Sequence, residues 1–282
     1  MTAGKLLNEA ISSLRENGID EPEANAQWLL SAVLKKNRAQ IILNPETEVS
    51  PSQEIMFGEY IRQKKQGIPL AYILGTQDFI DITLKVDSRV LVPRPETEEL
   101  AEYAAEFISS KFNGISINIL DYGAGSGAIG FWLLKKFPNA RLTAADKSAE
   151  ALECAKENAR QLRIYDRTSF ANVETPNSLS GHYSVIVSNP PYIPSAVIPG
   201  LSPEVLSEPY MALDGGSDGL SVARLVFGAA GRLLVPGGGL FMELSGGDPL
   251  RLKHEASNDI WKEIRSVQDF SGQQRFFVAI KA

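Results

Sequence analysis

The pattern of apolar positions divides the chain into two parts with different periods. In the first part, apolar residues recur at three- and four-residue spacing in LLNEAISSLRENG, EPEANAQWLLSAVLKKN and PSQEIMFGEYIRQKKQG, which predicts helices. Pro22 and Pro51 suit the first turn of a helix, and Gly18 and Gly67 suit helix ends. We therefore expect a small helical domain over residues 1–75.

A short strand-like region follows these helices. Apolar and polar residues nearly alternate in FIDITLKVD, and RVLVPRPETEEL gives a second strand-like run that ends in a proline-rich turn. This pattern predicts a β-hairpin linker over residues 76–97.

From residue 98 to residue 282, short apolar strands alternate with amphipathic helices. Helices are expected at 98–111, from the end of the glycine loop to 136, at 148–162, at 218–235 and near 249–257. Strands are expected at 117–120, 141–145, 184–188 and 239–244, and near 263–270 and 275–281. This alternation predicts an α/β domain with a mostly parallel sheet covered on both faces, closed by an antiparallel pair of strands.

Composition and charge limit the possible partners. With a net charge of -6, the chain lacks the excess of Lys and Arg that drives nonspecific binding to phosphates, so we expect no stable nucleic-acid binding. No apolar run approaches the ~20 residues of a membrane helix, and the first residues resemble neither a signal nor a transit peptide. We expect a cytoplasmic protein with no membrane partner. Cys154 and the two histidines provide no zinc ligand set, so we expect no metal.

The segment DYGAGSGAIGFWLL places a glycine loop between an apolar strand and an apolar helix. Such a loop lets a ligand approach the backbone closely, although it also serves as a compact connection in many proteins. The spacing matches neither a P-loop nor the dinucleotide fingerprint. The expected cofactor contacts are Asp121, Gly123, Ala124, Gly125, Ser126 and Gly127. For Asp121 two roles stay open, since it either contacts a charged amino group of the ligand or holds the loop by hydrogen bonds.

Asp146 ends the next strand, 23 residues after Gly123. At this place in an open α/β sheet a carboxylate accepts hydrogen bonds from both hydroxyls of a ribose, which indicates a nucleoside ligand. The alternative is a purely structural role at the start of the helix that follows Ser148.

The segment SVIVSNPPYIP places Asn189, Pro190, Pro191 and Tyr192 directly after a buried strand. Two consecutive prolines fix the backbone and remove two N–H donors, so nearby carbonyls remain as acceptors. The Asn189 side chain and the Pro190 carbonyl are candidates to hold both hydrogens of a planar NH2 group, while the Tyr192 ring covers its flat face. The alternative is a loop terminator with a capping asparagine.

These motifs together resemble those of class I S-adenosylmethionine-dependent methyltransferases that modify amide or exocyclic amino nitrogens. More narrowly, the chain is similar to the HemK/PrmC family of release factor glutamine methyltransferases. The similarity covers GIPLAYILGTQDF, VLVPRPETEEL, NPPYIP, EPYMALDGGSDGL and DFSGQQRFF. The resemblance implies a Rossmann-like catalytic domain, a helical domain that docks the substrate, S-adenosylmethionine as cofactor and a class 1 release factor as protein partner. The implied acceptor is the amide nitrogen (N5) of the glutamine in the Gly-Gly-Gln tripeptide.

Within this resemblance, Asn189, Pro190 and Tyr192 are the expected catalytic residues, and Asn189 also borders the cofactor. Arg94 in PRPETE either orders a loop over the cofactor or pairs with a neighbouring glutamate. Two segments depart from the family pattern. Glu174 is the nearest candidate for the adenine contact, and MELSGGD carries an inserted Ser245.

Two other classes of function remain open from the sequence. An adenine-N6 nucleic-acid methyltransferase presents the same planar NH2 group to such a motif, but it needs a basic channel for the strand, and this chain shows none. A nucleoside-binding protein or a ribosome-associated interaction module is the second alternative, and the intact NPPY segment argues against it.

Overall fold

The computed structural model describes residues 1–255 and 260–282, and the chain forms two compact units. The first unit consists of Met1–Thr76 and Leu201–Ser207, and the second of Gln77–Gly200 and Glu208–Ala282. The helical unit therefore includes a segment that is remote in sequence from the predicted domain of residues 1–75. Among the described residues, no helix is long and apolar enough to cross a membrane.

The first unit is helical, and the three helices predicted for it are present. Its elements are α1 (Ala3–Glu16), α2 (Pro22–Leu34), α3 (Arg38–Leu43), α4 (Pro51–Lys65), α5 (Leu70–Leu74) and, from the remote segment, α9 (Pro203–Leu206). Pro22 and Pro51 occupy first-turn positions. The short helices α3 and α5 were missed, because six and five residues are too few to show a helical period. α3 begins at a capping box formed by Asn37 and Gln40.

An ion pair with a buried lysine lies inside this unit. Lys64 of α4 is only 2% exposed, and its ammonium group pairs with Glu204 of α9. In addition, the Ser207 hydroxyl donates to the Gly67 carbonyl at 3.0 Å. Because a buried ammonium group is costly without a partner, the pair holds the remote segment on α4.

The hairpin consists of β1 (Thr76–Phe79) and β2 (Ile82–Lys85), which is shorter than predicted. Its turn consists of Ile80 and Asp81 and interrupts the alternating run. Ile80 has a φ of 55°, and the Asp81 carboxylate accepts a hydrogen bond from the Trp132 indole at 2.8 Å. The prediction of a second strand at RVLV was wrong, since these residues form no strand in the described chain. Val90 and Val92 are nevertheless buried.

The second unit is an α/β domain, as predicted. Its helices are α6 (Pro95–Lys111), α7 (Ala128–Lys136), α8 (Ala149–Gln161), α10 (Tyr210–Leu213), α11 (Ser221–Leu233) and α12 (Asp248–Glu255), with 3-10 turns η1 (Tyr165–Arg167), η2 (Pro176–Ser178) and η3 (Ile198–Gly200). Its strands are β3 (Asn118–Tyr122), β4 (Arg141–Asp146), β5 (Thr168–Asn172), β6 (Tyr183–Ser188), β7 (Leu234–Glu243), β8 (Trp261–Gln268) and β9 (Gln274–Lys281). The last two positions of the helix expected at 249–257 lie outside the described residues.

Within the described residues the sheet has seven strands in the order β5-β4-β3-β6-β7-β9-β8. β3 to β7 run parallel, and β9 is antiparallel to both β7 and β8. Strand β5 was not predicted, because TSFAN lacks a continuous apolar run and lies at the edge of the sheet.

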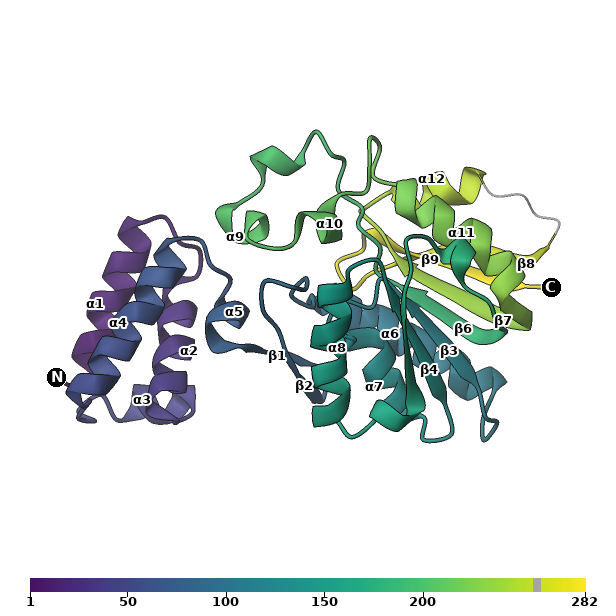
Figure 1. The fold of residues 1–282 in the computed structure, drawn as a ribbon. Helices are drawn as coiled ribbons and strands as arrows, with labels where there is room; N and C mark the ends of the chain where they lie inside the picture. Colours follow the sequence, from purple (N-terminus) through teal and green to yellow (C-terminus); the bar gives the residue numbers. More distant parts are fainter. Residues whose placement is uncertain (256–259) are drawn as a thin grey trace. The chain divides into compact units, whose positions relative to one another are not determined.

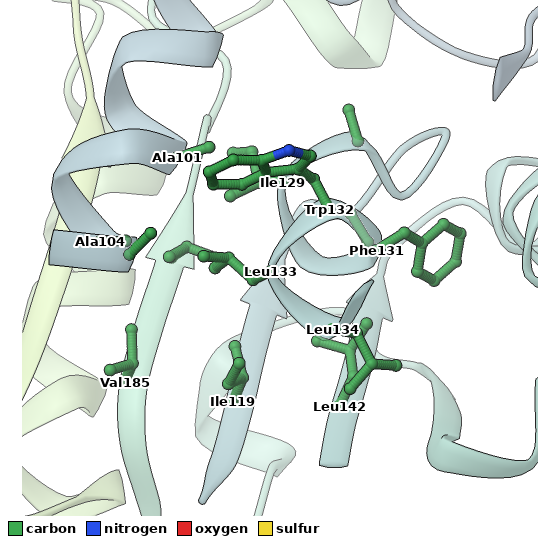
Figure 2. Close-up of a cluster of buried hydrophobic side chains, with 14 of the residues drawn as sticks. Ala101, Ala104, Ile119, Ile129, Phe131, Trp132, Leu133, Leu134, Leu142 and Val185 are labelled. Carbon is green, nitrogen blue, oxygen red and sulfur yellow. The ribbon is translucent and has the colours of Figure 1, made fainter. Parts of the chain in front are cut away.

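Helices cover both faces of this sheet (Figure 1), and a hydrophobic core lies between the sheet and the helices on each face. Successive strand residues alternate between the two cores: Ile119 belongs to the core under α6, α7 and α8, and Leu120 to the core under α11 and α12. Figure 2 shows the first core, where Ile129 and Leu133 of α7 lie between the strands and the small Ala101 of α6. Because both faces are covered, ligands have access mainly at the sheet's ends.

The order of the strands determines where a ligand binds. The chain runs outward from β3 to β4 and β5, then returns to the other side of β3 with β6. The carboxyl ends of β3 and β6 are neighbours, with Asp121 opposite Val187. In open α/β sheets such a reversal leaves a crevice that binds ligands. The glycine loop follows β3 and the Asn-Pro-Pro-Tyr segment follows β6, so both lie at this crevice.

Candidate active site

A pocket of about 670 Å³ lies at the carboxyl ends of β3, β4 and β6. It brings together most of the predicted site residues: its wall includes Asp121, Gly123, Ala124, Gly125, Ser126, Asp146, Asn189, Pro191 and Glu174. Among the described residues, the wall does not include Arg94, Gly127, Pro190 or Tyr192. The sequence motifs thus converge on one cavity, and the remaining four residues lie around it.

The glycine loop turns tightly enough to expose its backbone to the pocket. Gly123, Gly125 and Gly127 have φ values of 72°, 55° and 89°, a region that favours glycine. At Gly127 a Cβ atom would lie 2.0 Å from the Phe131 ring. The Gly123 N–H donates to the Ala145 carbonyl at 2.8 Å, which joins the loop to β4. Gly127 therefore shapes the loop and starts α7, while Gly123 and Gly125 border the ligand space.

A buried asparagine braces the same loop from behind. Asn158 of α8 is fully buried; its Oδ1 accepts from the Lys85 N–H at 2.7 Å, and its Nδ2 donates to the Lys85 and Ser126 carbonyls at 3.0 and 2.9 Å. One side chain thereby connects β2, α8 and the glycine loop. The sequence offered no signal for this role, because an asparagine inside a helical pattern is usually exposed.

We expect Asn158→Ala to lower the free energy of unfolding by about 3 kcal/mol, because it removes three hydrogen bonds to backbone groups that are partly or fully buried. Urea denaturation measures the change. Asn118→Ala, which removes an exposed asparagine bonded weakly to the His182 carbonyl at 3.4 Å, is the matched control and should stay near the parent value. Equal effects of the two substitutions would contradict the bracing role.

Asp121 lies under the glycine loop and is 1% exposed. Its Oδ2 accepts from the Gly130 N–H at 2.9 Å in the first turn of α7. Burial raises the pKa of this carboxyl to about 7, and the nearby Asp146 carboxylate contributes to the shift. The hydrogen bond supports the loop-holding role. Because Asp121 also borders the pocket, a contact with a charged amino group of the ligand stays a prediction.

The pKa of Asp121 has a consequence for stability. Its pKa rises from 3.8 to about 7 on folding, so between these values the folded state holds more protons than the unfolded chain. The stabilising contribution of this group is therefore lost as the pH rises through about 7. Asp121→Asn should remove this pH dependence. Relative to the variant, the parent should lose on the order of 4 kcal/mol of unfolding free energy between acid and alkaline pH. Urea titrations across the pH range test this, with the exposed Asp166→Asn as control; parallel profiles of Asp121→Asn and the parent would contradict it.

Asp146 is the last residue of β4, and its carboxylate faces two backbone donors. Oδ2 accepts from the Gly125 N–H at 2.9 Å, and Oδ1 accepts from the Ser148 N–H at 2.8 Å. Ser148 itself caps α8 through its own side chain. These bonds orient the carboxylate on the pocket wall, and each oxygen keeps further lone pairs that can accept from ribose hydroxyls. The structural and ligand-binding roles of Asp146 are therefore compatible.

The segment expected to contact adenine forms another part of the wall. Glu174 and Thr175 both border the pocket, but the Glu174 side chain is 70% exposed and pairs with Lys147. Val222 and Leu225 of α11 also border the pocket and supply apolar surface. A flat base can bind between such surfaces, so the adenine contact of Glu174 stays a prediction and the apolar side chains are additional candidates.

Asn189 connects the pocket to a buried hydrogen-bond chain. Its Nδ2 donates to Thr97 Oγ1 at 3.1 Å, and the Thr97 hydroxyl donates to Glu243 Oε2 at 2.7 Å. Tyr192 reaches the other oxygen of the same carboxylate, with its hydroxyl 3.4 Å from Oε1. Burial raises the pKa of Glu243 to about 7. Two residues of the Asn-Pro-Pro-Tyr segment thus converge on Glu243 at the end of β7.

The backbone after the two prolines is braced by the loop that precedes α11. The Ile193 N–H donates to the Leu213 carbonyl at 3.0 Å, and the Gly215 N–H donates to the Ile193 carbonyl at 2.9 Å. A Cβ atom on Gly219 would lie 2.5 Å from the Tyr192 carbonyl oxygen. The glycines of LDGGSDGL therefore allow a close approach that keeps Tyr192 in place.

Arg94 pairs with neither Glu96 nor Glu98. Its Nη2 donates to the buried carboxylate of Glu208 at 2.7 Å. Glu208 directly precedes Pro209, which borders the pocket. The arginine thus holds a loop of the pocket wall, whereas an ordering effect on the bound cofactor stays a prediction.

Sequence reasoning missed Thr97 and Glu243. Thr97 lies in PRPETEEL, in the first turn of α6. The sequence of this turn does not show that the Thr97 side chain faces inward. Glu243 had a detectable signal, because an acidic residue at the end of an apolar strand is rarely buried without a specific role. In MELSGGD, the unassigned Ser245 belongs to a turn, since its carbonyl accepts from the Asp248 N–H at 3.0 Å.

Two family models match the chain: the PrmC N-terminal domain over residues 5–75 and the methyltransferase small domain over residues 100–200. The release factor glutamine methyltransferase of Moorella thermoacetica is 35% identical over 100% of this chain and 99% of its own length. That of Deinococcus radiodurans is 37% identical over 98% of both chains.

A solved structure with a similar fold is the hMettl16 catalytic domain in complex with MAT2A 3'UTR hairpin 1. It has a TM-score of 0.54 at 13% identity, and the match covers 85% of this chain and 84% of that one. At this identity the similarity concerns the fold alone. The two full-length relatives and the family model over residues 100–200 are all named as methyltransferases.

Proposed function

Because this chain belongs to the family of release factor glutamine methyltransferases, we propose that it methylates the side-chain amide nitrogen (N5) of the glutamine in the Gly-Gly-Gln tripeptide of class 1 release factors. The proposed methyl donor is S-adenosylmethionine. One observation carries the proposal: the glycine loop, Asp146 and the Asn189 amide border a single pocket, so a nucleoside site and an NH2 acceptor site adjoin.

The residues of the pocket fit this cofactor. The backbone of Gly123 and Gly125 is open to the ligand, and Asp146 provides acceptors for ribose hydroxyls. Val222 and Leu225 provide apolar surface for a base. When bound, S-adenosylmethionine supplies an electrophilic methyl group on a positively charged sulfur.

Asn189 addresses the main difficulty of the reaction. An amide nitrogen is a poor nucleophile because its lone pair is delocalised into the carbonyl group, so positioning supplies much of the rate. The Asn189 Oδ1 and the Pro190 carbonyl are the proposed acceptors for the two hydrogens of the glutamine NH2 group. The same acceptors stabilise the positive charge that the nitrogen gains as the new C–N bond forms.

Tyr192 and the glutamine's own proton complete the proposed mechanism. Tyr192 is held by Glu243 and by the backbone around Gly219. A ring held in this way is suited to pack on the flat face of the substrate amide. Burial and the Glu243 carboxylate raise the pKa of the Tyr192 hydroxyl above its ordinary value, so it stays protonated and is no base. The proton of the methylated nitrogen therefore leaves to water after transfer.

Methyl transfer to three acceptors tests the proposal. Labelled S-adenosylmethionine is mixed with the protein and a class 1 release factor, the same factor with Gln→Ala in its Gly-Gly-Gln tripeptide, or duplex DNA. We expect label on the parent factor and on neither of the others. Label on DNA would favour an adenine-N6 methyltransferase. Label on the Gln→Ala factor would show that another residue of the factor is methylated.

A further inference from the structure

We propose that Thr97 and Glu243 are positioning residues that orient the Asn189 amide, and that this orientation lets the site select a glutamine amide over a glutamate carboxylate. The inference rests on the proposed function and deepens it. It starts from the direction of each hydrogen bond in the buried chain from Asn189 to Glu243.

The direction of the chain follows from what each group can donate. An ionised carboxylate only accepts, so the Thr97 hydroxyl uses its single proton on Glu243 Oε2. The hydroxyl oxygen is then left as an acceptor, and the side-chain group of Asn189 that meets it must be the NH2 group. Because the amide is planar, its Oδ1 points away from Thr97. Asn189 thus offers the substrate an acceptor.

Burial makes this orientation costly to change. Thr97 and Glu243 are 4% and 1% exposed, so water does not readily replace either hydrogen bond. If Asn189 rotated by half a turn, its Oδ1 would face the lone pairs of the Thr97 oxygen, and a buried acceptor would lose its donor. The helix α6 and the strand β7 supply the two buried groups. The fold therefore fixes the amide before the substrate arrives.

The fixed orientation has a chemical consequence for substrate choice. A glutamine side chain presents an NH2 group, which donates to Asn189 Oδ1. A glutamate carboxylate presents only acceptors, so its oxygen would face the Asn189 oxygen without a proton between them. A site built around a specific hydrogen bond rejects the analogue that lacks it.

Protonation of Glu243 would reverse the direction of the hydrogen bonds that link it through Thr97 to Asn189. The groups that face this carboxyl are Thr97 and Glu96 of α6, Tyr192 after β6 and Arg275 of β9. Burial raises its pKa most, and Glu96 adds to this. The hydrogen bond from Thr97 lowers the pKa, as do Arg275 and Tyr192, with a result of about 7. A protonated Glu243 can donate to Thr97, whose own proton then becomes available to Asn189 Oδ1. The orientation that holds glutamine is therefore lost as the pH falls through about 7.

Thr97→Val tests the inference, because valine keeps the shape and removes the hydroxyl. We expect kcat for the release factor to fall about 10²-fold, whereas Thr97→Ser keeps the hydroxyl and should restore most of the parent rate. In Thr97→Val the Asn189 amide is free to rotate, so competition by a release factor with Gln→Glu in its tripeptide should become about tenfold stronger relative to the glutamine factor. An unchanged ratio would overturn the proposal, even if kcat fell.

The matched control is Thr83→Val on the exposed hairpin, which also breaks a hydroxyl–carboxylate bond, here to Asp78 at 2.7 Å. It should leave both kcat and the selectivity ratio at the parent values. If Thr83→Val changed the ratio as Thr97→Val does, the effect would belong to folding in general and the proposal would fail.

A readout on the protein alone separates this inference from the proposed function. In 15N-labelled protein, the side-chain NH2 signals of Asn189, assigned by their absence in Asn189→Asp, should exchange slowly with water and shift with an apparent pKa near 7. Glu243→Gln should abolish this titration. Fast exchange or no titration in the parent would overturn the orientation even if glutamine is methylated. A protected, titrating amide in a protein that transfers no methyl group to the factor would instead refute the proposed function.

Discussion

Asn189→Ala is expected to lower kcat for glutamine methylation by about 10²- to 10³-fold, the range observed when one preorganised hydrogen-bond partner of a transition state is removed. Alanine removes the Oδ1 acceptor for the NH2 group and ends the hydrogen bond to Thr97. It leaves the glycine loop and Asp146 unchanged. Affinity for S-adenosylmethionine, measured by calorimetry, should therefore stay near the parent value while single-turnover methyl transfer is lost.

Asn118→Ala serves as the control for this substitution as well, because it removes an exposed asparagine from the same domain. It should retain the parent rate. If Asn189→Ala also turned over near the parent rate, the NH2 clamp would be wrong. If it lost cofactor binding and activity to the same degree, Asn189 would belong to the cofactor site and not to the acceptor site.

The second large effect is expected at the other end of the pocket, where Asp146→Ala should weaken S-adenosylmethionine binding about 100-fold. Two hydrogen bonds from ribose hydroxyls to a charged acceptor account for about 3 kcal/mol, which corresponds to that factor. The substitution also frees the Gly125 and Ser148 N–H groups and so loosens the glycine loop. Both effects act on affinity in the same direction.

Calorimetric titration with S-adenosylmethionine measures this affinity, and Asp146→Asn helps to separate the two effects. Asparagine keeps one acceptor for a backbone N–H and loses the negative charge and the second acceptor, so its affinity should lie between those of the parent and Asp146→Ala. The exposed Asp166→Ala should bind like the parent. An unchanged affinity in Asp146→Ala would remove this residue from the ribose role.

The sequence predicted the α/β domain well because its core elements carry strong periodic patterns. The strands β3, β4 and β6 are buried on both faces and read as short apolar runs between helices. Strand β5 was not predicted. It lies at the edge of the sheet with one partner strand and carries fewer apolar residues than the central strands. The prediction of a strand at RVLV was wrong because its valines are buried in a segment that forms no strand.

The candidate site shows a similar division between local and distant features. Asp146, Asn189 and the glycine loop were predictable because each has a local motif at the end of a strand. Thr97, Asn158 and Glu243 were not assigned, because their roles arise from contacts across 92, 32 and 146 positions of sequence. Of these three residues only Glu243 has a local signal, as an acidic residue at the end of an apolar strand, and that signal does not show which residues it contacts.

The most direct test of the account locates the methyl group itself. A class 1 release factor is incubated with the protein and S-adenosylmethionine, digested, and the peptide that carries Gly-Gly-Gln is fragmented by mass spectrometry. The account predicts a single added methyl group on the glutamine side-chain amide with the parent protein and essentially none with Asn189→Ala. A methyl group on any other residue, or the same yield with Asn189→Ala, would contradict it.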